Sequence, residues 1–204
     1  MTPQEIDRFF RVLAKEVKTP VNVIVTGAAA GALWGCVRPS KDIDFAIEVR
    51  NGGAHAWNGV EKAVRRTIVV TGIPANYAQD IDRWGQISLL DYRRHTLRYK
   101  TFGMVDVRIL DPAYWAIGKL TRYLEPDVQD LIAAFSAKGI PAGRLVRVWG
   151  TAVKKSPPST ARLPFRQHVE HFIRRHGRKM WGRQFDPEPA LREFYRAAGA
   201  VPET

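Results

Sequence analysis

Residues 21–49 read VNVIVTGAAAGALWGCVRPSKDIDFAIEV, and this stretch decides the fold. Val21 to Thr26 is mostly β-branched, which favours a strand. Gly27 opens a turn, and the small residues from Ala28 to Gly35 predict a helix after it. Ile43 to Val49 then predicts a second strand. The stretch is therefore expected to form a strand, a helix and a strand joined by short turns.

The flanking sequence extends this unit into a larger domain. Thr2 and Glu5 form a capping-box pattern with a proline between them, which predicts the start of an amphipathic helix. Residues 72–92 carry no clear pattern. The other expected elements are helices over 3–17 and 56–71, a hairpin of His95–Phe102 and Met104–Leu110 about Gly103, and helices from Pro112 to about Tyr123, from Glu125 to Gly139 and from Pro141 to about Val153.

This order of elements predicts a mixed α/β (α+β) protein with flanking helices and a helical C-terminal half. We expect three parts. Residues 1–110 form the α/β core with the N-terminal helix, residues 111–153 form a helical subdomain, and residues 154–204 form a basic helical tail.

Composition limits the partners. The chain has 204 residues, a formal net charge of +12 and a pI near 10.2. Such an excess of positive charge favours a polyanionic partner: nucleic acid, nucleotide or an acidic membrane surface. Val21 to Val37 is uncharged, but it is too short and too often interrupted to span a membrane. The absence of a secretory pattern and the single cysteine, Cys36, predict a cytoplasmic protein without a disulfide.

Two carboxylates stand out in the second strand. Asp42 and Asp44 are two residues apart, so their side chains leave the same face, while Ile43 and Phe45 point to the other. Adjacent carboxylates repel each other unless a cation lies between them, and Mg²⁺ typically takes one or two carboxylates plus phosphate oxygens. The alternative is that the pair is the solvated face of an edge strand.

Asp106 offers a third carboxylate. It lies between apolar residues in the expected strand 104–110, where an unpartnered acid is costly. As a third ligand it would complete a set for two Mg²⁺ ions. The alternative is an ion pair with Arg108 or a nearby lysine.

The turn before the helix is suited to phosphate. A glycine lets the backbone approach a phosphate group, and a helix N-terminus favours an anion. Gly27 and Ala28 are therefore candidate nucleotide-binding residues, and Arg38 and Lys41 could neutralise phosphate charge. Ordinary surface charge is an equally good explanation for Arg38 and Lys41.

The run from Gly27 to Phe45, with Arg38-Pro-Ser-Lys-Asp-Ile-Asp-Phe45 at its end, resembles the signature of the nucleotidyltransferase (polymerase-beta-like) superfamily. The helical part, from Leu110 through Lys119 to Leu131, is similar to that of AbiEii-like nucleotidyltransferase toxins. This resemblance implies a nucleotidyltransferase-type sheet, metal ligation by Asp42 and Asp44, a triphosphate contact for Lys119 and a site role for Asp130. Asp127 is a rival for the place of Asp130. Ala28 and Ser40 depart from the family pattern, where Gly or Ser and Thr are usual.

The resemblance implies an Mg²⁺-dependent enzyme that moves a nucleoside monophosphate from a triphosphate to a hydroxyl. An RNA acceptor, such as the 3′ end of tRNA, agrees with the basic composition. The toxin members also imply a cognate antitoxin protein as a partner. The alternative is a non-catalytic nucleic-acid- or protein-binding module on the same fold.

The basic tail is the last candidate. Lys154 to Arg183 could bind RNA phosphates, with aromatic side chains for packing or base stacking. A solvated basic helix is the alternative. The histidines do not have a recognised zinc spacing and are interpreted as part of the tail. The aromatic residues of this segment are Phe165, Phe172 and Trp181, and its histidines are His168, His171 and His176.

Overall fold

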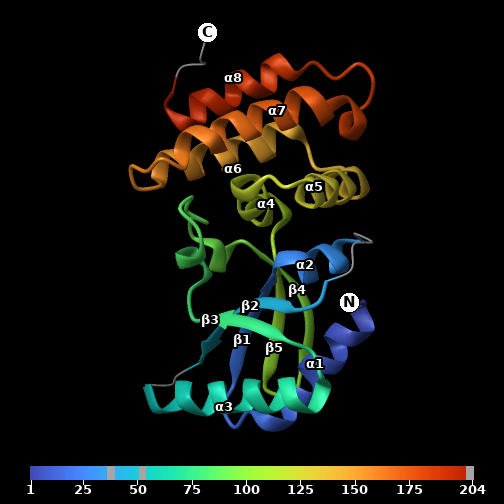
Figure 1. Cartoon of the computed structure of the whole chain (residues 1–204), viewed down its shortest axis with the longest axis vertical. Coiled ribbons are helices and arrows are strands. Elements are labelled where there is room, and N and C mark those ends of the chain that lie inside the picture. The colour runs from blue at the N-terminus through green and yellow to red at the C-terminus, as the bar shows by residue number, and fades with distance from the viewer. Residues whose placement is uncertain (36–39, 51–53, 201–204) are drawn as a thin grey trace. The chain divides into compact units, whose positions relative to one another are not determined.

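The computed structural model describes residues 1–35, 40–50 and 54–200 (Figure 1). Contacts between residues divide the chain into two compact units. Unit 1 comprises the described residues of Met1–Leu33, Val37–Ile81 and Arg93–Leu110. Unit 2 comprises those of Trp34–Cys36, Asp82–Tyr92 and Asp111–Thr204.

Unit 1 is built on a five-stranded mixed sheet with the strand order β3-β2-β1-β5-β4. β1 lies at the centre, antiparallel to β2 and parallel to β5, and β2 pairs in parallel with β3. The strands are β1 (Val21–Thr26), β2 (Ile43–Val49), β3 (Ala75–Ala78), β4 (Thr96–Phe102) and β5 (Val105–Leu110). The helices of this unit are α1 (Pro3–Glu16), α2 (Gly27–Trp34) and α3 (Ala54–Thr71).

The sheet of unit 1 has one apolar face. Alternate residues of β1, β2 and β5 are buried there, as period-two patterning requires. α1 and α3 pack side by side at the bottom of Figure 1, and the rings of Phe9 and Phe10 meet Phe45 edge-on at 6.0 and 5.8 Å. The capping box is confirmed, because the Thr2 hydroxyl accepts from the Glu5 N–H and the Glu5 carboxylate accepts from the Thr2 N–H.

Unit 2 is helical. Its main elements are α4 (Pro112–Arg122), α5 (Glu125–Lys138), α6 (Ala142–Lys155), α7 (Arg162–Trp181) and α8 (Pro187–Ala198). Trp149 is fully buried and donates from its indole N–H to the carbonyl of Ala113. A Cβ at Gly150 would lie 2.5 Å from the carbonyl of Phe194, so this glycine permits the close approach of α6 and α8.

The predicted mixed α/β class, with a helical C-terminal half, is confirmed. The unassigned residues 72–92 contain β3 and a short 3₁₀ helix, Ile81–Trp84, and α8 was not predicted. In the expected basic tail, α7 and α8 pack with α4, α5 and α6 within unit 2. Among the described residues, no helix is both long and apolar enough to cross a bilayer.

Candidate functional site

The carboxylates of Asp42 and Asp44 lie together at one edge of the unit 1 sheet. The side-chain nitrogen of Asn76 donates to Asp42 Oδ2 at 2.9 Å and to Asp44 Oδ1 at 3.0 Å. Asn76 reaches both because β2 and β3 are parallel and place it directly beside Asp44. Both carboxylates are half-buried and Asn76 is exposed, so the pair is open to small ligands.

Gly27 brings the start of α2 against this pair. Its φ of +62° lies in the left-handed region, and a Cβ there would lie 1.9 Å from Asp44 Oδ2. The glycine is therefore required twice, by its own backbone conformation and by the nearby carboxylate. Gly27 therefore lies against Asp44, and Ala28 follows in the first turn of α2.

Ser40 contacts the backbone of Asp42. Its hydroxyl donates to the carbonyl of Asp42 at 2.7 Å and approaches Asp42 Oδ1 at 3.5 Å. Asp42 forms no ion pair with any residue that the structure describes.

Asp106 is not part of this group, and its prediction as the third metal ligand is wrong. The sheet register places Asp106 beside Asn22 at the start of β1, whereas Asp44 lies beside Thr26 at its end. Four residues of strand correspond to about 13 Å. Asp106 instead accepts from Arg50 at 3.3 Å and from the Thr101 hydroxyl at 3.0 Å. The expected ion-pair partner, Arg108, bonds to Thr96.

The Asp42 and Asp44 pair could hold one magnesium ion. No group of three or more His, Cys, Asp or Glu side chains that could hold a metal occurs within the described ranges. Mg²⁺ nevertheless needs only one or two protein carboxylates when phosphate oxygens and water complete its shell. The half-buried pair, already close enough to share one amide nitrogen, fits that requirement.

Comparison of the chain with protein-family models, with curated proteins and with solved structures gives no match. The site is therefore argued from its own geometry.

Unit 2 contains a second carboxylate cluster around Lys119. The Lys119 ammonium donates to Asp127 Oδ1 at 3.0 Å and to Asp130 Oδ2 at 2.6 Å, and all three side chains are at most 4% exposed. Arg122 adds a bidentate contact to Asp127 at 2.8 and 3.1 Å. Asp127 and Asp130 are three residues apart on α5 and share a face, so both rivals from the sequence contact Lys119.

The charges of this cluster are balanced within the protein. Burial alone would raise the pKa of Asp127, but hydrogen bonds from Arg122 and Lys119 bring it below its ordinary value. The ammonium of Lys119 also lies 5.3 Å from the centre of the Trp115 ring. A buried lysine with two carboxylates is a complete structural unit, and Lys119 would have to exchange a carboxylate for phosphate to contact a nucleotide.

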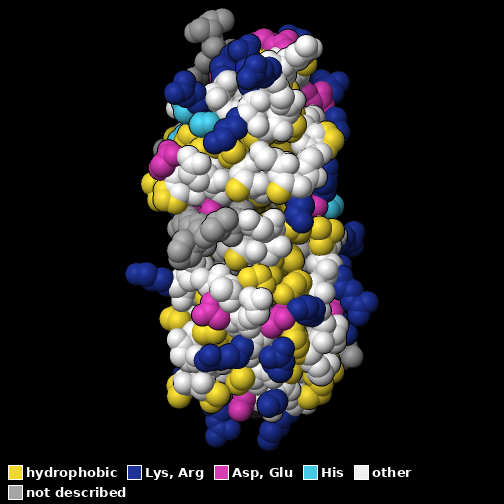
Figure 2. Space-filling view, turned by 90° about the vertical axis from the view of Figure 1, so that its right-hand side faces the viewer, with side chains coloured by type: hydrophobic (Ala, Val, Ile, Leu, Met, Phe, Trp, Pro, Cys, Tyr) yellow, Lys and Arg dark blue, Asp and Glu magenta, His cyan; other side chains and the backbone are white. Residues whose placement is uncertain are grey.

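The other predicted nucleotide contacts have less support. Lys41 is exposed in the turn before β2, and Arg38 lies outside the described residues. On the face drawn in Figure 2, Lys and Arg side chains are spread over the surface rather than gathered in one patch. The +12 charge therefore does not by itself mark a binding site.

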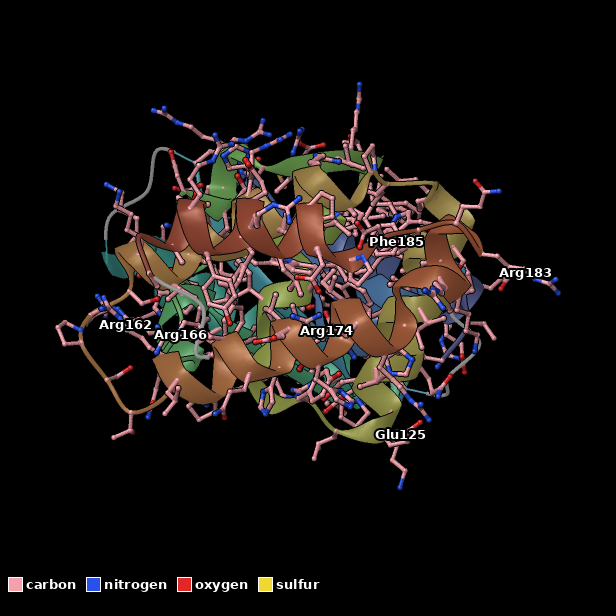
Figure 3. All side chains as sticks on the ribbon, turned by 90° about the horizontal axis from the view of Figure 1, so that it is seen from above. Glu125, Arg162, Arg166, Arg174, Arg183 and Phe185 are labelled. Carbon is pink, nitrogen blue, oxygen red and sulfur yellow. The ribbon has the colours of Figure 1, made fainter. Side chains whose placement is uncertain are left out.

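The basic segment Lys154–Arg183 is mostly a packed helix. Phe165 and Phe172 are at most 1% exposed, so they pack in unit 2 and cannot stack on bases. Trp181 donates to the carbonyl of Ile140 at 2.8 Å and its ring lies 4.7 Å from that of Phe185. Arg162 and Arg166 lie at one end of α7 and Arg183 beyond the other, so these charges do not converge (Figure 3).

The histidines of α7 form an aromatic cluster. The Tyr123 ring stacks on His168 at 4.6 Å, and its hydroxyl is 2.7 Å from His171 Nδ1. Burial, with a smaller contribution from Glu125, raises the pKa of Tyr123 to about 12. Burial and the neighbouring His171 lower the pKa of His176. The rings of His171 and His176 meet edge-on at 6.2 Å.

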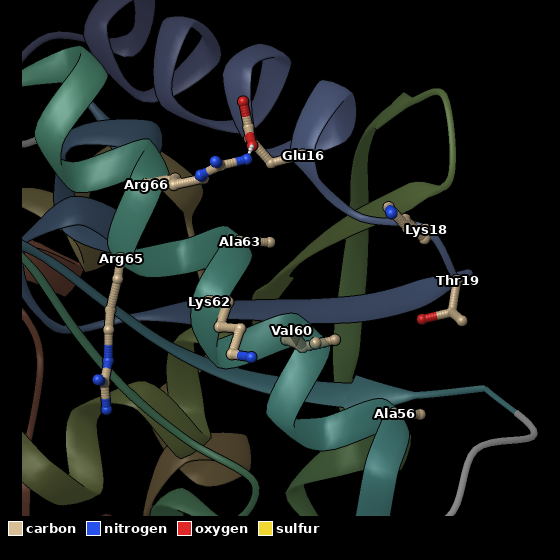
Figure 4. A pocket seen from close by; sticks show the side chains of 10 residues that line it. Glu16, Lys18, Thr19, Ala56, Val60, Lys62, Ala63, Arg65 and Arg66 are labelled. Atoms are coloured by element: carbon tan, nitrogen blue, oxygen red, sulfur yellow. Dashed lines mark ion pairs between the residues drawn. The ribbon is translucent and has the colours of Figure 1, made fainter.

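One large pocket, of about 660 Å³, lies between α1 and α3 in unit 1 (Figure 4). It carries four basic side chains, but Arg66 is paired with Glu16 at 3.5 Å and Arg65 extends away from it (Figure 4). The basic side chains that line this pocket therefore do not converge on a common position.

Two features of the unit 1 sheet were not predicted from the sequence. Asn76 was not identified as a site residue, because β3 has only four residues and lies within residues 72–92, where the sequence shows no clear pattern. The arginines around Asp106 are scattered over three strand segments, and only the sheet brings them together.

Proposed function

We propose that the protein is an Mg²⁺-dependent nucleotidyltransferase, with Asp42 and Asp44 as the metal-holding carboxylates. The observation that carries the proposal is the shared position of these two groups at the Gly27 bend, where β1 passes into α2. Helix N-termini favour anions, and a carboxylate pair beside one can hold a cation that also contacts phosphate. The resemblance to nucleotidyltransferases supports the same assignment.

In the proposed reaction, an acceptor hydroxyl oxygen attacks the α-phosphorus of a nucleoside triphosphate. The bond between the α-phosphorus and the bridging oxygen breaks, pyrophosphate leaves, and the hydroxyl proton passes to solvent. A bound magnesium ion would neutralise triphosphate charge and favour ionisation of the hydroxyl. Asp42 and Asp44 would hold the cation, Ser40 fixes the backbone carbonyl of Asp42, and Gly27 keeps the backbone close to Asp44.

The remaining roles rest on the resemblance and on charge. The resemblance to the toxins implies a triphosphate contact for Lys119 and a site role for Asp130, and Lys119 would have to exchange a carboxylate for phosphate to make that contact. The excess of Lys and Arg supports an RNA acceptor, with the tRNA 3′ end as the specific candidate, in the cytoplasm.

The alternative is a non-catalytic nucleic-acid-binding module on this fold. Asn76 favours it, because one neutral amide already satisfies an oxygen of each carboxylate without any metal. The wrong prediction for Asp106 also removes the set for two metal ions.

Label transfer separates the two. The protein is incubated with Mg²⁺, each labelled nucleoside triphosphate in turn, and total RNA. We expect label on RNA with the wild type and none above background with Asp42→Asn or Asp44→Asn. Glu48→Gln is the matched control, because Glu48 is an exposed carboxylate on the same face of β2. Transfer that survives both aspartate substitutions, or no transfer by the wild type with any triphosphate, would favour the module.

A further inference from the structure

A second hollow lies on the sheet of unit 1. It has a volume of about 350 Å³, and three arginines surround a single carboxylate in it. We call it the arginine pocket: it is lined by Arg50, Arg98, Thr101, Asp106 and Arg108.

The one acid in the arginine pocket is already satisfied. Asp106 Oδ2 accepts from Arg50 and Oδ1 accepts from Thr101. No Asp or Glu among the described residues forms an ion pair with Arg98 or Arg108. The pocket therefore keeps an excess of positive charge.

The sheet places two of these charges against each other. Arg98 on β4 and Arg108 on β5 are direct partners in the antiparallel register, and a register shift follows immediately, between Arg98 and Lys100. Like charges directly opposite each other destabilise a strand pair. An anion bound between the two guanidinium groups would remove that repulsion.

Two of the three guanidinium groups are held in position. Arg108 Nε donates to the Thr96 hydroxyl at 2.6 Å, and Arg50 Nε donates to Asn22 Oδ1 at 2.6 Å. Side chains fixed in this way lose less conformational freedom when they bind a ligand. Guanidinium groups also match the geometry of phosphate oxygens.

The arginine pocket opens on the sheet face that carries Asp44. Arg108 is level with Ile24 of β1 and Asp44 is level with Thr26, so the two rows are about 7 Å apart along the strands. Residues two apart on β1 share a face. Both places therefore lie on one face of the sheet, with the buried side chains of Ile24 and Ala46 between them.

We propose that the arginine pocket binds a backbone phosphate of a single-stranded nucleic acid, and that this strand is the RNA acceptor. The second clause rests on the proposed function, whereas the binding itself does not. A strand whose terminal hydroxyl lies at the Asp42 and Asp44 pair would place an upstream phosphate over Arg98 and Arg108.

The test measures binding of a short fluorescent single-stranded RNA without triphosphate, over a series of salt concentrations. Arg98→Gln, Arg108→Gln and the double variant should bind more weakly, and the slope of log K against log salt should fall by about 0.7 for each lost phosphate contact. Arg65→Gln on α3 is the matched control, because Arg65 is exposed and lies outside the pocket. Arg98 is exposed, so its variant keeps the test valid if Arg108→Gln fails to fold.

Equal losses in Arg98→Gln and Arg65→Gln would overturn the proposal. So would a loss of ATP binding with RNA binding unchanged, which would assign the pocket to the triphosphate. The same RNA titration with Asp42→Asn/Asp44→Asn protein separates the two proposals. If RNA binding depends on the arginines but no label is transferred, the proposed enzyme activity is contradicted and the arginine pocket is supported. If the arginine variants leave label transfer unchanged, the proposed enzyme stands and the arginine pocket does not bind the RNA acceptor.

Discussion

The two carboxylate clusters, one in each unit, solve the problem of adjacent negative charges in different ways. Asp127 and Asp130 are buried and share the ammonium of Lys119. Asp42 and Asp44 are half-buried and share the neutral amide of Asn76. In the unit 2 cluster, side chains of the protein supply the positive charges. In the unit 1 pair, Asp42 has no cationic partner among the described residues.

This difference separates stability from function. A buried charge without a partner is expensive, so removing one member of the unit 2 cluster should weaken the fold. A half-buried pair next to solvent loses little stability when neutralised, but it loses its charge toward a ligand. The four predictions below test this contrast.

The largest effect on stability is expected for Lys119→Met. It leaves Asp127 and Asp130 buried without the shared ammonium, and breaking a buried ion pair in this way costs about 3–5 kcal/mol. Urea unfolding measures the change. Lys179→Met, at an exposed position on α7, is the control and should change the free energy of unfolding little. A loss in Lys119→Met no larger than in this control would show that the cluster does not stabilise unit 2.

A smaller effect is expected from acid. The pKa of Asp127 is lower in the folded protein than its ordinary value of 3.8, so the folded state binds this proton less readily than the unfolded state. The stability that Asp127 contributes is therefore fully present above its ordinary pKa and is lost as the pH falls through the lower folded value. Unfolding free energies measured across the acidic range should decline less steeply for Asp127→Asn. Parallel curves for the two proteins would contradict the assignment.

The position of Asp106 along the sheet could not be predicted from the sequence. The sequence correctly places Asp106 within a strand. Its level in the sheet depends on the register between β1 and β5, strands that are not consecutive in the chain, and no local pattern encodes that register. The contact of Lys119 with Asp127 and Asp130 was easier to anticipate, because all three lie on two consecutive helices and the two aspartates share a face.

The third prediction concerns the bend at Gly27. An alanine in the left-handed region costs about 1–2 kcal/mol wherever it occurs. Gly72→Ala is the matched control, because its φ of +68° is close to the +62° of Gly27 but nothing lies within 4 Å of the added Cβ. Both variants should melt at lower temperatures than the wild type, and Gly27→Ala should melt at the lowest because it must also displace Asp44. Only Gly27→Ala should weaken nucleotide binding with Mg²⁺. Equal nucleotide affinity in the two variants would separate Gly27 from the site.

The smallest effect should come from Asn76→Asp, and it tests the metal site without activity. The substitution replaces an amide donor with a third carboxylate facing Asp42 and Asp44. Without divalent cations the variant should lose about 1 kcal/mol, from the missing hydrogen bonds, with charge repulsion adding to that loss. Mg²⁺ or Mn²⁺ should then raise its melting temperature more than that of the wild type, because cation binding to the folded state stabilises it. Asn76→Ala loses the same hydrogen bonds without adding charge, so it should not gain this metal response. If Asn76→Asp responds to metal no more than Asn76→Ala, the three side chains do not converge on a cation, and the half-buried pair of unit 1 is a solvated strand edge.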